Sequence, residues 1–194
     1  MKKHFKTIPV LLILALTAAA LPTGPAQAGG AKYKRSAETY QVPDVVLINQ
    51  DGKKVRLTSL LKSDQPVVVD FIYGTCTTIC PVLSAGFVNL QRKFDPRGPM
   101  PRLISITIDP ENDSPKVMKE YLKRYHAQPG WEFLTGSRAD IDAVMKSFHA
   151  YIPDKMSHYP LNLIRTPKEG NWVRLFGLLS SREFLEEYQN CATK

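Results

Sequence analysis

Residues 67 to 81 read Val67-Val-Val-Asp-Phe-Ile-Tyr73-Gly-Thr-Cys76-Thr-Thr-Ile-Cys80-Pro81, and this stretch decides the fold class. It opens with a short apolar run rich in β-branched residues, which predicts a strand buried on both faces. Pro81 suits a first helical turn, and the apolar residues after it recur at helical spacing. We therefore expect a buried strand, a turn with two cysteines, and then a helix.

The two cysteines, Cys76 and Cys80, are four residues apart. On a helix, positions i and i+4 share one face with Cβ atoms roughly 6 Å apart, so both thiols would point the same way. Such a pair can hold a soft metal ion as two thiolates, or it can close into a disulfide. A purely structural disulfide across so short a loop would constrain little of the unfolded chain. We therefore expect the pair to be functional.

The first 28 residues have the pattern of a cleaved secretory signal. Three lysines in the first six residues precede an apolar stretch at 8 to 21, and Ala26-Gln27-Ala28 supplies small residues for cleavage after Ala28. The apolar stretch is shorter than the roughly 18 to 20 residues that span a bilayer, which disfavours the alternative of an uncleaved membrane anchor. The pattern thus predicts an exported protein that is soluble in the periplasm.

The remaining residues are predicted to form one domain. Residues 29 to 43 are polar without periodicity and predict a flexible lead-in, whereas residues 44 to 194 are enough for one domain with a full core. The formal net charge is +8, but basic residues are not interleaved with aromatic ones. We therefore expect no nucleic-acid partner, and we expect a monomer with a solvated basic surface.

Strands and helices alternate along this domain. The predicted elements are a hairpin with its turn at Asp51-Gly52, buried strands at 67–73 and 103–108, helices after Pro81 and Ser114-Pro115, a short strand at 131–134, a helix at 138–150, strands at 161–164 and 173–176, and a final helix at 182–189 with Ser180 and Glu183 as a capping box. This order predicts a single α/β domain of thioredoxin-like architecture, with a central mixed sheet flanked by helices and an N-terminal β-hairpin. Sites in such sheets collect at the carboxyl ends of the strands.

Four segments carry a close resemblance to a known family. They are Cys76-Thr-Thr-Ile-Cys80-Pro81, then Ser105-Ile-Thr-Ile-Asp109-Pro110-Glu-Asn-Asp-Ser-Pro115, then Tyr121-Leu-Lys-Arg-Tyr125, and His158 ahead of a predicted strand. Over roughly residues 44 to 190, the chain resembles the Sco (SenC) family of copper-binding accessory proteins for cytochrome c oxidase assembly.

The resemblance implies one copper ion, as Cu(I) or Cu(II) or both, held by Cys76, Cys80 and His158. It also implies a partner, which is a copper-receiving oxidase subunit or another copper protein and is associated with the membrane. Independent chemistry agrees, because thiolates are soft and favour Cu(I), while an imidazole suits either oxidation state. A site with three ligands also leaves room for a partner to take the ion.

Three other residues have more than one interpretation. Asp109 follows the end of a predicted strand, where it is expected either to tune the cysteine site and guide a partner, or to cap the turn before Pro110. Pro160 follows His158-Tyr159 and invites comparison with the cis-proline that thioredoxin relatives place beside their cysteines, although the sequence does not reveal the isomer. Cys191, the fourth residue from the chain's end, is predicted to be an incidental thiol in a mobile tail rather than a ligand.

The remaining histidines and the tryptophans are expected to be structural. His126 and His149 fall within predicted helices, and the resemblance assigns them no role. Trp131 and Phe133 lie in a predicted strand and Trp172 in a predicted hairpin, so core packing is favoured over ligand stacking.

Three function classes are consistent with these residues. The first is a non-enzymatic copper metallochaperone that delivers copper to the binuclear copper site of cytochrome c oxidase. The second is a thiol-disulfide reductase that cycles Cys76 and Cys80 to keep a client's cysteines reduced, for which His158 should be dispensable. The third is a peroxidase, which usually needs an arginine near its activated cysteine, and no arginine flanks Cys76. We expect the first, with the second as the alternative.

Overall fold

The computed structural model describes residues 1, 33–95, 97, 100–167 and 170–193. The predicted secretory signal and its cleavage point therefore lie outside the described residues, apart from Met1. Within the described part of the chain, none of the helices has the length and apolarity that crossing a membrane requires.

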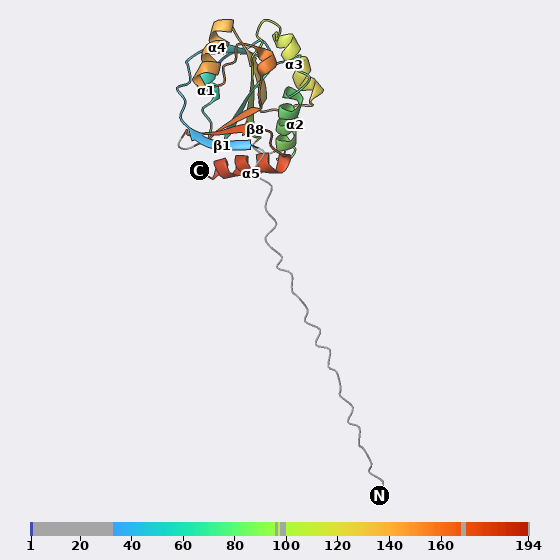
Figure 1. Cartoon of the computed structure of the whole chain (residues 1–194). Coiled ribbons are helices and arrows are strands. Elements are labelled where there is room, and N and C mark those ends of the chain that lie inside the picture. Colours follow the sequence, from blue (N-terminus) through green and yellow to red (C-terminus); the bar gives the residue numbers. More distant parts are fainter. Residues whose placement is uncertain (2–32, 96, 98–99, 168–169, 194) are drawn as a thin grey trace. The chain divides into compact units, whose positions relative to one another are not determined.

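A mixed β-sheet organises the described residues, with its strands in the order β1-β8-β7-β4-β5-β6-β2-β3 (Figure 1). The strands are β1 Tyr33–Glu38, β2 Val46–Asn49, β3 Lys54–Arg56, β4 Val67–Ile72, β5 Arg102–Thr107, β6 Trp131–Thr135, β7 Leu161–Arg165 and β8 Trp172–Gly177. The pairs β4·β5 and β5·β6 are parallel, whereas the other neighbours are antiparallel. This confirms the predicted α/β class with a mixed sheet.

Strand β4 lies in the interior of the sheet and is buried along its whole length. It pairs with β5 on one side and β7 on the other, so that Val68 lies between Leu103 and Ile164. Complete burial of a valine side chain contributes roughly 1.5 to 3 kcal/mol, which favours the apolar run at this central position. The turn with the two cysteines therefore starts from a fully buried strand.

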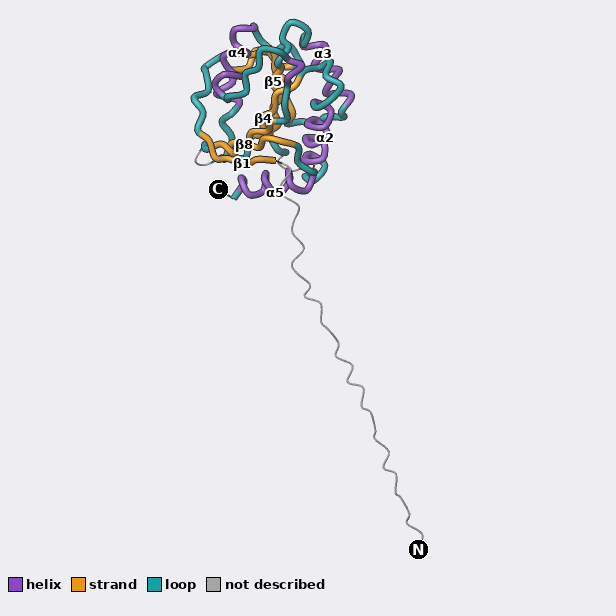
Figure 2. Tube along the Cα trace, in the orientation of Figure 1, coloured by secondary structure: helices purple, strands orange, loops and turns teal. Residues whose placement is uncertain are grey.

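Helices cover both faces of the sheet. They are α1 Leu57–Leu60, α2 Cys80–Gln91, α3 Pro115–Arg124, α4 Arg138–Ser147, the 3₁₀ helix η1 Lys155–Ser157, and α5 Ser181–Ala192. Figures 1 and 2 show α1 and α4 on one side of the sheet and α2 and α3 on the other, with α5 beside α2. The rings of Phe87 and Phe184 stack between α2 and α5, with centroids 6.1 Å apart.

Several predicted local signals are present in the structure. The Ser114 hydroxyl caps α3, and Ser180 and Glu183 form the expected capping box at the start of α5. Gly52 has a φ of 74° in the hairpin turn, where its N–H donates to the Asn49 carbonyl. These features need only neighbouring residues, which is why the local pattern predicts them.

His126 and His149 terminate helices rather than lying within them. Each follows its helix, α3 or α4, and has a φ of 52°. In both places the N–H of the next residue donates to a carbonyl five positions back, as in a Schellman motif. The prediction that both histidines are helical is therefore wrong, and the predicted helix 138–150 ends at Ser147.

Two segments that we predicted to be irregular belong to regular elements. The described part of the lead-in over residues 29 to 43 contains β1, which pairs with β8 along all six residues. The side chains of Tyr33 and Arg35 donate to the Glu187 carboxylate on α5. Cys191 is fully buried within α5 rather than in a mobile tail. Both predictions are corrected, because the order comes from distant partners that a local pattern does not include.

Candidate metal centre

The turn between β4 and α2 positions the two cysteines. The N–H of Cys76 donates to the Tyr73 carbonyl at 3.2 Å, which closes the turn after β4. The Cys76 sulfur in turn accepts a hydrogen bond from the N–H of Cys80 at 3.5 Å. Only Cys80 is helical, so the two cysteines do not share a helix face as we expected. The thiols lie together instead because the Cys76 sulfur sits at the amino end of α2.

The buried carboxylate of Asp113 fixes the backbone of this turn through hydrogen bonds. The Gly74 N–H donates to both carboxylate oxygens of Asp113, at 3.0 and 3.1 Å, and the Thr107 hydroxyl also donates to Asp113. A Cβ at Gly74 would lie 2.7 Å from Asp113 Oδ1, so only glycine allows this approach. Asp113 belongs to the segment that carries the family resemblance, but we did not single it out from the sequence.

His158 reaches the cysteines from a distant part of the chain. It follows η1 and precedes β7, which pairs with β4. Its Nδ1 lies 3.7 Å from Cys80 Sγ, and its ring meets the Tyr73 ring edge-on, with centroids 6.3 Å apart. The structure therefore brings together all three residues that the resemblance implies.

The sulfur atoms of Cys76 and Cys80 and a ring nitrogen of His158 all lie within 4.8 Å of one another. Both cysteines are free thiols and are nearly inaccessible to solvent, at 7% and 0% exposure. Two thiolates and a neutral imidazole are a soft donor set that suits Cu(I). The residues present therefore fit a copper ion.

The two thiols have opposite tendencies to ionise. Burial acts against ionisation of Cys76, but hydrogen bonds from Cys80 and Thr78 outweigh it and lower the pKa of Cys76 to about 7. Burial, followed by the neighbouring Cys76, raises the pKa of Cys80 well above its usual range. The amino end of α2 also favours a thiolate at Cys76. Cys76 is therefore the thiol of the pair that ionises around neutral pH, whereas Cys80 stays protonated.

Burial lowers the pKa of His158 below its ordinary value of 6.5. The imidazole is therefore neutral at pH 7, which is the state that binds a metal ion. No proton has to leave His158 when an ion arrives at neutral pH.

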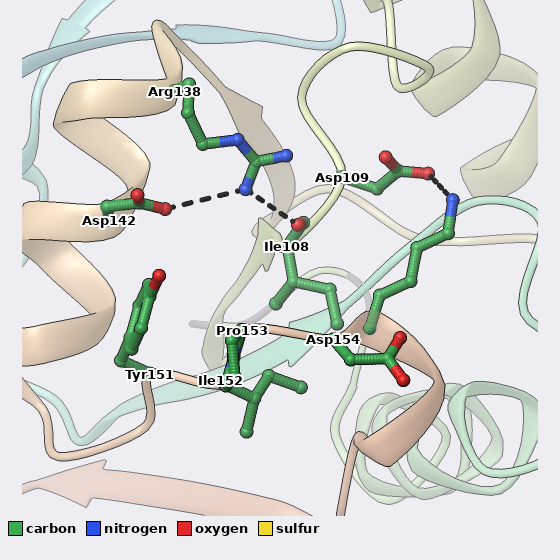
Figure 3. Close-up of a pocket in the computed structure, with 9 residues that line it drawn as sticks. Ile108, Asp109, Arg138, Asp142, Tyr151, Ile152, Pro153 and Asp154 are labelled. Carbon is green, nitrogen blue, oxygen red and sulfur yellow. Dashed lines mark hydrogen bonds and ion pairs between the residues drawn. The ribbon is translucent and has the colours of Figure 1, made fainter.

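Asp109 lies in a polar pocket next to the cysteine turn and does not contact the thiols directly. Its carboxylate accepts hydrogen bonds from Asn112, at 3.0 Å, and from the Lys155 ammonium, at 2.6 Å. Figure 3 shows Asp109 in this pocket opposite Arg138, which donates to the Ile108 carbonyl. The Asp109 carboxylate therefore bonds within its own turn, to Asn112, and to Lys155. It is connected to the cysteine turn only indirectly, because the Lys155 ammonium is also 5.4 Å from the Tyr73 ring centroid.

Tyr73 contacts both His158 and Lys155, and we did not predict it as a site residue. Burial, followed by a hydrogen bond to Cys76, raises the pKa of Tyr73 to about 12, so its hydroxyl stays protonated. The hydroxyl also lies 3.9 Å from Met156 Sδ. Its position directly after a buried strand and three residues before Cys76 is the only sequence signal that could have identified it.

The other expectations about this region have simple outcomes. The Tyr159–Pro160 bond is trans, since the described residues contain no cis peptide bond. Trp131, Phe133 and Trp172 are all buried in the core, which confirms their structural role.

Comparison with known proteins places the chain in a family. The SCO1/SenC family profile matches residues 34–181, which is most of the chain. The chain belongs to the SCO1/SenC family. It is 37% identical over 126 residues to the SCO1 protein homolog of Bacillus subtilis (strain 168), and the match covers 63% of this chain and 64% of that relative. The chain therefore spans somewhat less than two thirds of the length of this SCO1 homolog.

Solved structures agree with this assignment. The structure of BsSco, a member of the Sco family of cytochrome c oxidase assembly proteins in which a disulfide switch was identified, is similar with a TM-score of 0.66 and 30% identity. That match covers 81% of this chain and 96% of BsSco. Bradyrhizobium japonicum ScoI with copper bound has a TM-score of 0.60 and 28% identity, over 75% of this chain and 95% of ScoI. These similarities confirm the predicted Sco fold.

Proposed function

We propose that this SCO1/SenC protein is an exported metallochaperone that carries one copper ion on Cys76, Cys80 and His158 to the binuclear copper site of a cytochrome c oxidase. The observation that carries the proposal is the cluster of two sulfurs and one imidazole nitrogen within 4.8 Å. The copper bound in Bradyrhizobium japonicum ScoI, a relative at 28% identity, supports it. Copper is the cargo here, so the site has to release the ion as well as bind it.

The geometry suits transfer of Cu(I). Cys76 supplies a thiolate near neutral pH, Cys80 loses its proton when the ion binds, and His158 is already neutral. Three ligands leave one position open, through which a sulfur or nitrogen of the receiving protein can bind before the donor's ligands leave. The receiving site is expected to belong to a membrane-associated oxidase subunit.

The test is an anaerobic Cu(I) titration of the reduced, exported protein, with copper counted by elemental analysis. We expect one tightly held copper per wild-type chain and a loss in affinity of at least about 100-fold in His158→Ala, since even the residues that only support a metal ligand are worth 10- to 100-fold. The matched control is His126→Asn, which removes an exposed imidazole and keeps a side chain that tolerates a positive φ. Equal affinity of His158→Ala and wild type would contradict the three-ligand site.

A second candidate function is supported by the unequal thiols. The Cys76 thiolate can attack a client's disulfide and expel one client sulfur as a thiolate, forming a mixed disulfide. Cys80 then attacks Cys76 and releases the second client sulfur, so two electrons pass to the client and Cys76–Cys80 becomes a disulfide. Reduction of a client peptide that is unaffected by His158→Ala, together with no retained copper, would favour this reductase over the chaperone.

A further inference from the structure

The sulfur atoms of the metal centre are shielded from solvent. Cys76 is 7% exposed and Cys80 is 0% exposed. His158 is half-buried between the rings of Tyr73 and Tyr159. An arriving copper ion therefore needs a group that reaches both the solvent and these ligands.

The side chain of Met156 is such a group. It lies on η1, two residues before His158, and it is 75% exposed. Its Sδ is 3.9 Å from the hydroxyl of Tyr73, whose ring also meets the His158 ring edge-on, with centroids 6.3 Å apart. One tyrosine side chain therefore contacts both an exposed thioether and a ligand of the metal centre.

The exposure of Met156 is unusual for its residue type. Met118 and Met145 are buried in the core, at 0% and 2% exposure, as expected for a large apolar side chain. A thioether is a soft, neutral ligand that binds Cu(I) in preference to harder ions. Because it carries no charge and does not have to lose a proton, it can take up and release the ion without a change in pH.

We propose that Met156 is a transient Cu(I) ligand through which the ion enters and leaves the site formed by Cys76, Cys80 and His158. This inference rests on the proposed copper-carrying function. A bond from Met156 Sδ to Cu(I) forms as the donor's ligand leaves, and it breaks as the Cys76 sulfur binds. The ion stays Cu(I) throughout, no electron moves, and the proton of Cys80 passes to solvent.

The experiment measures Cu(I) exchange by anaerobic stopped flow, with transfer from the loaded protein to a coloured Cu(I) chelator such as bathocuproine disulfonate. Met156→Leu keeps the size of the side chain and removes the sulfur. We expect this variant to exchange Cu(I) at least about fivefold more slowly than wild type, with an equilibrium affinity within about twofold of wild type. The reason is that a transient ligand stabilises the transition state of Cu(I) transfer more than it stabilises the final copper-bound protein. The matched control is Met100→Leu, which lies just before β5 at the opposite end of the parallel strands from the cysteines.

Oxidation of the apoprotein to the Cys76–Cys80 disulfide is measured in the same variants. An unchanged rate in Met156→Leu, together with slower Cu(I) exchange, supports the ligand role. Exchange as fast as in wild type overturns it, and so does an equal slowing of disulfide formation, which would mean that Met156 acts through the packing of Tyr73. Failure of the proposed function is distinct, because the wild-type protein would then hold no copper before exchange begins.

Discussion

Asp70 is a buried carboxyl group in the middle of β4, and its replacement by asparagine should stabilise the protein at alkaline pH. The residue is 0% exposed, and neither carboxylate oxygen has a hydrogen-bond partner among the described residues. Burial, opposed by the neighbouring Ser105, raises the pKa of Asp70 from 3.8 to about 7. At about 1.4 kcal/mol per pKa unit, this shift corresponds to about 4 kcal/mol as an upper limit.

The sign of the effect follows from the number of protons bound in each state. Between pH 4 and pH 7 the folded protein holds a proton on Asp70 and the unfolded chain does not, so stability falls as pH rises. The loss is complete once pH exceeds the folded pKa of about 7. Asp70→Asn removes the ionisation, so it should match wild type near pH 4 and exceed its stability by about 2 to 4 kcal/mol at pH 8.

The assay is guanidinium-induced unfolding of the apoprotein at several pH values from 4 to 8.5. Asp64→Asn, which changes an exposed carboxylate, is the control and should lie within about 0.5 kcal/mol of wild type at every pH. A stability difference between Asp70→Asn and wild type that does not grow with pH would refute the reasoning. So would a loss of stability in Asp70→Asn at pH 8.

Three further predictions concern the site and the ends of helices. Above pH 7, where only Cys80 releases a proton on binding, Cu(I) affinity should rise about tenfold per pH unit. Below pH 7, where Cys76 also releases a proton, the rise should approach about a hundredfold per pH unit. Affinities from chelator competition that do not change with pH would contradict this. His126→Gly and His149→Gly should each stabilise the protein by about 1 kcal/mol in urea unfolding, because glycine adopts a positive φ without strain. Cys191→Ser should cost about 1 kcal/mol or more by thermal unfolding, since a hydroxyl replaces a buried thiol, and an unchanged melting temperature would argue against this.

Local patterns predict those parts of the fold whose partners are neighbours in the chain. The run from Val67 predicts β4 because β-branched residues favour extended chain and a continuous apolar segment must be buried on both faces. Ser114 and Ser180 predict the starts of α3 and α5, because a capping hydroxyl bonds to an N–H three residues away. The left-handed ends at His126 and His149 are not predicted, since glycine, the usual signal, is absent.

The sequence by itself determined that two cysteines follow a buried strand and precede a helix, because strand, turn and helix each depend on a few adjacent residues. It suggested His158 only through family resemblance. The tertiary structure decided that His158 lies 3.7 Å from a cysteine 78 positions away, that Asp113 holds the turn, and that Met156 stands beside Tyr73. These contacts arise from the pairing of β7 and β5 with β4, and the choice among distant strands depends on how the whole core packs.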